Sequence, residues 1–105
     1  MNSDVIAFVT PMYYFGMSST LKKVVDRFYS IDQQLKGLKN KGVLISVQHA
    51  PAEIVKEPIN AHYQAILSWL NMENAGIVNA IGIESVEHLK QTEYPKQAYE
   101  LGKNL

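Results

Sequence analysis

The stretch that decides the fold is Val5-Ile6-Ala7-Phe8-Val9, a continuous run of β-branched, aromatic and small apolar residues that Thr10-Pro11 closes. The run shows no alternation of apolar and polar residues. It therefore predicts a β-strand buried on both faces, as in a parallel sheet.

An amphipathic helix is predicted next, over residues 18–38. Its N-cap is expected at Ser18 or Ser19, because a hydroxyl there can accept a hydrogen bond from a free amide of the first turn. Charged residues lie between apolar positions that recur at helical spacing, namely Leu21, Val24, Val25, Phe28, Ile31 and Leu35.

The rest of the chain repeats this alternation. Strands are predicted at residues 43–47 and 76–81, and a helix with Pro58 in its first turn lies between them and ends at residues 71–74. Residues 84–90 read as a solvated loop or short helix, and residues 94–105 as a last helix. One domain, residues 1–105, thus forms a β-α-β-α-β-α series, which predicts a parallel sheet with ligands bound beyond the carboxyl ends of its strands. The loops beginning at Thr10, Gln48 and Gly82 are the candidates.

Composition excludes several classes of function. Ten Lys and Arg balance ten Asp and Glu, so no net field favours nucleic acid or an anionic membrane as a partner. The absence of Cys removes disulfides, thiolate chemistry and Cys-based metal sites, and the three histidines show no metal-ligand spacing. No run of about 20 apolar residues is present, and no basic region precedes the first apolar run. We expect a cytoplasmic protein without a metal.

The loop after the first predicted strand concentrates aromatic and sulfur-containing side chains. Three aromatics and two methionines could grip a flat conjugated ligand by stacking and dispersion, while a glycine lets backbone approach and a serine offers a hydroxyl. Packing of each aromatic into the local core is an equally open alternative. The residues of this loop are Pro11, Met12, Tyr13, Tyr14, Phe15, Gly16, Met17 and Ser18.

Residues 4–22, together with Asp26-Arg27-Phe28, resemble the third strand, flavin loop and third helix of the NAD(P)H-dependent FMN reductase family. Residues 59–63, 75–78 and 98–105 are similar to later elements of the same family. The resemblance implies an α/β, flavodoxin-like three-layer sandwich, here truncated to three parallel strands with alternating helices. It covers nearly the whole chain and is most specific in the first loop.

The resemblance also implies a cofactor and the residues that hold it. In the family the first loop packs along the isoalloxazine ring of FMN, and the loop after the next strand lines the other side of the ring; NAD(P)H is the implied reductant. His49 could donate a hydrogen bond to a flavin carbonyl, although a solvent-exposed loop histidine is the plainer alternative. No catalytic residue is identified. The implied cofactor-binding residues are Pro11, Met12, Tyr13, Tyr14, Phe15, Gly16, Ser18, Gln48, His49 and Ala50.

Family members begin with a strand and a phosphate-binding loop at the start of the first helix, followed by a second strand and helix, and none of these elements is present in the 105 residues. FMN is therefore expected to bind weakly to this chain alone. The edge of the strand at residues 5–9 is expected to lie open and to be covered by a homodimer or by a complementing chain. Two functions remain in competition: a flavin-associated oxidoreductase, and a non-catalytic module that dimerises or complements a separate amino-terminal half.

Overall fold

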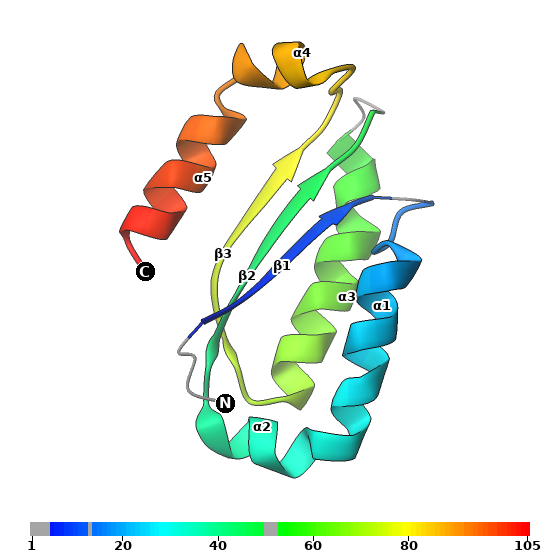
Figure 1. Cartoon of the computed structure of the whole chain (residues 1–105), viewed down its shortest axis with the longest axis vertical. Helices are drawn as coiled ribbons and strands as arrows, with labels where there is room; N and C mark the ends of the chain where they lie inside the picture. Colours follow the sequence, from blue (N-terminus) through cyan, green and yellow to red (C-terminus); the bar gives the residue numbers. More distant parts are fainter. Residues whose placement is uncertain (1–4, 13, 50–52) are drawn as a thin grey trace.

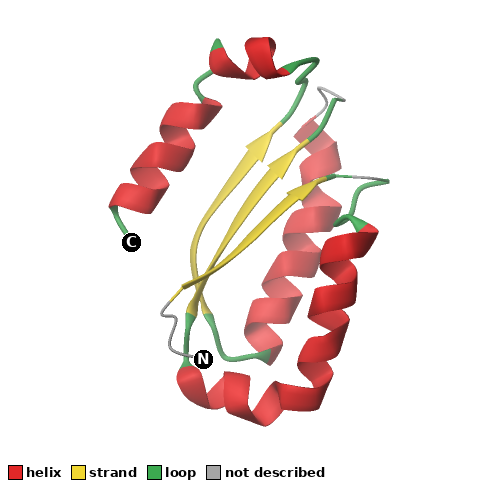
Figure 2. Cartoon of the chain, in the orientation of Figure 1, coloured by secondary structure: helices red, strands yellow, loops and turns green. Residues whose placement is uncertain are grey.

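The computed structural model describes residues 5–12, 14–49 and 53–105, with the side chain of Val55 left out. Three parallel strands form one sheet in the order β1-β2-β3 (Figure 1). They are β1 (Val5–Pro11), β2 (Lys41–Val47) and β3 (Glu73–Ala80). The predicted α/β series of three parallel strands alternating with helices is confirmed, and Figure 2 shows helices on both sides of the sheet.

The register of the sheet brings the three strand exits together. Pro11 pairs with Val47 across β1 and β2, and Val47 pairs with Ala80 across β2 and β3. All three strands run in the same direction, so the loops that follow them leave from one rim. This rim is the carboxyl edge at which open α/β sheets bind ligands.

The helix predicted at residues 18–38 is broken into three segments. They are α1 (Ser19–Asp26), a 3-10 turn η1 (Arg27–Ile31) and α2 (Asp32–Leu38). Between them, the Ser30 hydroxyl donates a hydrogen bond to the carbonyl of Arg27 at 2.9 Å. The run from Phe28 to Ile31 is aromatic, hydroxylic and β-branched, so its helix propensity is low, and side-chain bonding to the backbone competes with the helical pattern. The apolar periodicity was read correctly, but not this interruption.

The remaining elements follow the prediction with shifted ends. Helix α3 (Lys56–Trp69) is preceded by a 3-10 turn η2 (Glu53–Val55), and β3 begins three residues earlier than predicted. After β3, residues 84–90 form the short helix α4 (Val86–Lys90), which Ser85 caps by accepting a hydrogen bond from the amide of His88. The last helix is α5 (Tyr94–Lys103). Within the described residues, no helix is long and apolar enough to cross a membrane; the cytoplasmic location stays a prediction.

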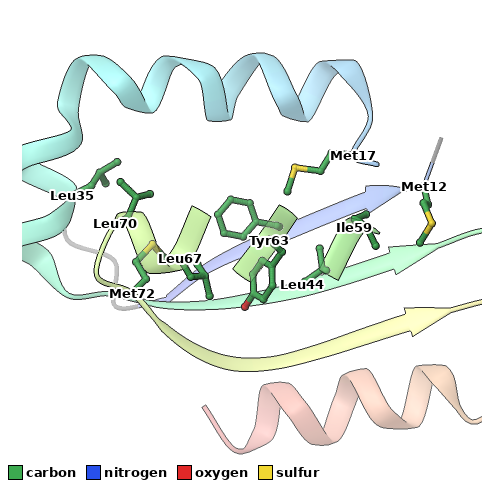
Figure 3. Close-up of a cluster of buried hydrophobic side chains, with 10 residues drawn as sticks. Met12, Met17, Leu35, Leu44, Ile59, Tyr63, Leu67, Leu70 and Met72 are labelled. Carbon is green, nitrogen blue, oxygen red and sulfur yellow. The ribbon is translucent and has the colours of Figure 1, made fainter. Parts of the chain in front are cut away.

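The core lies between the sheet and the layer formed by α1, α2 and α3 (Figure 3). Tyr63 of α3 is fully buried, and its ring meets the ring of Phe8 edge to face, with centroids 5.8 Å apart. The Tyr63 hydroxyl donates to Oδ1 of Asn74 at 2.9 Å, and burial raises the pKa of Tyr63 to about 12. The other fully buried large side chains include Leu35, Leu44, Ile59, Leu67 and Leu70.

Strand β1 is buried on one face only, which corrects the prediction of burial on both. Phe8 and Thr10 are 1% and 2% exposed, whereas Val9 between them is 63% exposed. The cause is the distribution of helices: α1 and α3 cover one face of the sheet, while α5, on the other face, lies against β3 (Figure 1). β2, in the middle of the sheet, is buried as predicted, since Val43, Leu44 and Ser46 all lie inside.

Candidate functional site

Thr10 and Ser18 tie together the two ends of the loop that follows β1. The buried Thr10 hydroxyl accepts a hydrogen bond from the Ser18 amide at 2.9 Å and donates to the carbonyl of Pro11 at 2.7 Å. The Ser18 hydroxyl in turn accepts from the amide of Leu21 at 3.2 Å, which makes Ser18 the N-cap of α1. The loop is thus fixed at both ends to the sheet and to the helix.

Met12 and Met17 do not belong to the exposed surface of this loop. Both side chains are nine-tenths buried and pack into the core beneath the loop (Figure 3). The amide of Met12 donates to the carbonyl of Val47 at 2.9 Å, which extends the pairing of β1 and β2 by one residue. The flexible, unbranched thioethers fill the end of the core, so the expectation that both methionines present a ligand surface is wrong for their side chains.

Tyr14 and Phe15 are the aromatic residues that the loop does expose. Tyr14 is 98% exposed and Phe15 51%, and both have left-handed backbone conformations, with φ of 47° and 70°. For non-glycine residues this conformation is costly and persists only where the surroundings impose it. Beside them, a Cβ placed on Gly16 would meet no atom within 4 Å, so open space borders the loop there. For these two aromatics, packing into the core is ruled out.

The loop after β2 is tied to β3. The Gln48 amide donates to the carbonyl of Ala80 at 2.8 Å, and the Gln48 carbonyl accepts from the amide of Ile83 at 3.0 Å. Gln48 is therefore buried and anchored, while the next residue, His49, is exposed. These backbone bonds hold the loop after β2 against the loop that begins at Gly82.

The two loops border one depression. It is open, has a volume of about 650 Å³, and is lined by Met12, Tyr14, Phe15, Gln48 and His49. All five residues belong to the two loops singled out from the sequence. A second depression, of about 660 Å³, lies between β3 and α5 around Gly76 and Leu101, away from these loops.

The other predicted site residues differ in where they lie. Pro11 is exposed at the end of β1, Ser18 is half-buried at the start of α1, and Gly16 follows the two exposed aromatics. Tyr13 and Ala50 lie outside the described residues, so their predicted roles stay predictions. Among the described residues, no three His, Cys, Asp or Glu side chains gather as a metal site would require.

Sequence reasoning missed a buried polar chain beneath the depression's rim. The amide of Asn79 in β3 donates to the Ser46 hydroxyl of β2 at 2.6 Å, and the Asn60 amide of α3 donates to Oδ1 of Asn79 at 2.9 Å. These bonds join two strands and the covering helix near their carboxyl ends. The available signal was one polar residue inside each of two apolar strands; buried polar groups of this kind are usually paired.

The residues present fit the ring of a flavin better than its phosphate. The exposed faces of Tyr14 and Phe15, with the open space at Gly16, offer a surface for a planar conjugated ring. The lining residues include no Lys or Arg that could pair with a dianionic phosphate. The depression therefore accounts for one part of an FMN molecule.

Comparisons with solved structures support the fold. The Trp repressor binding protein from Bacillus subtilis has a TM-score of 0.83 at 24% identity, with 94% of this chain and 63% of that chain covered. The WrbA-like flavodoxin from Agrobacterium tumefaciens has a TM-score of 0.62 at 18% identity, with 94% of this chain and 68% of that chain covered. At these identities the likeness concerns the fold alone.

A curated relative and a family model complete the comparison. The FMN-dependent NADH:quinone oxidoreductase of Hydrogenovibrio crunogenus (strain DSM 25203 / XCL-2) is 29% identical over 111 residues, covering 86% of this chain and 55% of the relative. The chain thus spans about half the length of that relative. The family model Flavodoxin_2, described as a flavodoxin-like fold, matches residues 1–104. The predicted resemblance is confirmed: this chain belongs to the flavodoxin-like fold family of FMN reductase-like proteins.

Proposed function

We propose that this chain holds the isoalloxazine ring of FMN in the depression between the loops after β1 and β2, as part of an NAD(P)H-dependent oxidoreductase. The observation that carries the proposal is the exposure of Tyr14 and Phe15 beside one depression shared with Gln48 and His49. The relative from Hydrogenovibrio crunogenus is named as FMN-dependent and as using NADH, which supports the same assignment.

The chain's own residues bind and orient in this proposal. The aromatic faces of Tyr14 and Phe15 stack against the ring, and the open space at Gly16 admits the ring's edge close to the backbone. His49, exposed on the opposite loop, donates a hydrogen bond to a ring carbonyl. Bound FMN supplies the capacity to accept a hydride from a reduced nicotinamide, whereas the protein supplies position and the exclusion of water from one ring face.

A flavin titration tests this proposal. Quenching of FMN fluorescence by the purified chain should saturate, and Tyr14→Ala and Phe15→Ala should each weaken binding by about 2- to 10-fold, since an aromatic contact contributes about 0.5–1.5 kcal/mol. Tyr29→Ala is the matched control, because Tyr29 is 84% exposed on η1, on the helical layer. It should leave the affinity unchanged. Absence of quenching at high-micromolar protein would end the proposal for the isolated chain.

The second candidate is a non-catalytic module that dimerises or complements a separate amino-terminal half. The depression favours it in one respect: its lining contains no cationic side chain for the phosphate of FMN. The two candidates are separated by NADH oxidation in the presence of saturating FMN. Turnover that depends on Tyr14 and Phe15 supports the oxidoreductase, and ring binding without turnover supports the module.

A further inference from the structure

Strand β1 presents an unpaired edge with little protection. β2 is the neighbour of β1 in the described sheet, and no other described strand pairs with it. The strand contains no charged residue, and its one proline, Pro11, is its last residue. Exposed edges of soluble proteins are normally blunted by charge, proline or bulges because their free N–H and C=O groups attract another strand. This edge has such a device at one end only.

The sheet face beside this edge is also uncovered. Ala7, Val9 and Pro11 are exposed on the side of β1 that faces away from α1 and α3, with Val9 63% exposed. Helix α5 lies on this side but against β3, at the far end of the sheet (Figure 1). Parallel sheets are normally covered on both faces. The strand therefore lacks both a neighbouring strand and a covering helix.

We propose that the edge and open face of β1 bind a strand-helix-strand segment from outside these 105 residues, and that this segment completes the flavin site. The inference of a completed site rests on the proposed function; the interface does not. The segment's first strand pairs in parallel with β1, and the helix that follows it packs on Ala7 and Val9.

The handedness of crossover connections fixes the order of elements in this segment. On passing from β1 to β2 and from β2 to β3, the connecting helices α1 and α3 lie on the same face of the sheet (Figure 1). A connection of the same hand that advances in the opposite direction places its helix on the opposite face. A strand beside β1 must therefore be followed by a helix and then by a strand farther out, for that helix to cover Val9.

Such a helix begins at the carboxyl rim, beside the depression of Tyr14 and Phe15. The first turn of a helix carries free amides and the positive end of its dipole, which favour an anion. The depression itself has no cationic lining residue. The segment thus supplies what the ring-binding loops lack, and it should make the site prefer FMN over riboflavin, which has the same ring without the phosphate.

The lengths of the relatives favour this occupant over a second copy of the chain. The Bacillus subtilis structure shares 94% of this chain but is spanned for only 63% of its own length, so about a third of it lies outside the shared region. A strand-helix-strand unit takes about 30 residues or more. A second copy pairing through its own β1 brings no free helix, because its α1 and α3 already cover its own sheet.

Sedimentation without flavin tests the interface. The probe is the part of the Bacillus subtilis protein outside the region that this chain spans, mixed with the purified chain. We expect a one-to-one complex. Val9→Lys should weaken it by at least about tenfold, because a charge would be buried under the helix. Val24→Lys is the control: Val24 is 51% exposed on α1, on the opposite layer, and should leave the complex unchanged.

Failure of the probe to bind overturns the proposal, as does self-association of the chain that the probe does not displace and that Val9→Lys abolishes. Flavin titrations of the complex then test completion of the site. A preference for FMN over riboflavin in the complex, absent in the chain alone, supports it, and equal affinities overturn it. A complex that forms but binds no flavin sinks the proposed function and leaves the interface standing.

Discussion

The two faces of β1 are built from adjacent residues and behave as opposites. Phe8 is 1% exposed and packs against Tyr63, while Val9, the next residue, is 63% exposed. Both are large and apolar, so the chain's local chemistry does not distinguish them. The difference lies in the helices: α1 and α3 cover one face, and α5 reaches only β3 on the other. One face of β1 is a core, and the other is an unfilled contact.

The largest expected effect compares these two faces directly. Phe8→Ala should lower the free energy of unfolding by about 3–5 kcal/mol, because it leaves a cavity beside Tyr63. Val9→Ala should cost less than about 1 kcal/mol, since the side chain stays largely in water. Urea denaturation of both variants measures the contrast. Equal losses would mean that the open face of β1 is covered in solution, by self-association or otherwise.

A smaller effect measures how dry the covered face is. Because burial raises the pKa of Tyr63 to about 12 from 10.0, the unfolded chain loses this proton first as the pH rises. The contribution is constant below pH 10, and the free energy of unfolding should fall between pH 10 and 12, by up to about 3 kcal/mol.

Tyr63→Phe isolates this contribution from other groups that titrate in the same range. The variant should lose about 1 kcal/mol at neutral pH, through the missing hydrogen bond to Asn74, and should be less sensitive to alkali than the parent. Chemical denaturation at a series of pH values provides the comparison. An identical alkaline slope in both proteins would contradict burial of this hydroxyl.

The smallest effect concerns the anchor between the helical layer and the candidate site. Ser18→Ala should lower the free energy of unfolding by about 1 kcal/mol, because the amide of Leu21 loses its capping acceptor. Ser19→Ala is the neighbouring control, since Ser19 is exposed and does not act as the N-cap; its effect should be near zero. Thermal denaturation compares the two. A larger loss at Ser19 would show that the helix begins elsewhere.

The candidate site was predicted in outline from the two loops, and the structure changed its membership. Tyr14, Phe15, Gln48 and His49 share one depression, as a parallel sheet requires of loops that leave the same rim. Met12 borders it but packs mainly into the core, because a thioether fills an apolar gap as readily as it meets a ligand. Thr10 was overlooked, since nothing in a lone threonine indicates that its hydroxyl will bind an amide eight residues later.

By itself the sequence determined the alternation of strands and helices, the parallel sheet and the family, because apolar periodicity and loop residues are local properties. Only the tertiary structure decided which face of β1 is buried, where the helix after it breaks, and which loop side chains turn inward. Each of these depends on which elements lie next to one another, and residues as alike as Phe8 and Val9 differ only in what packs against them.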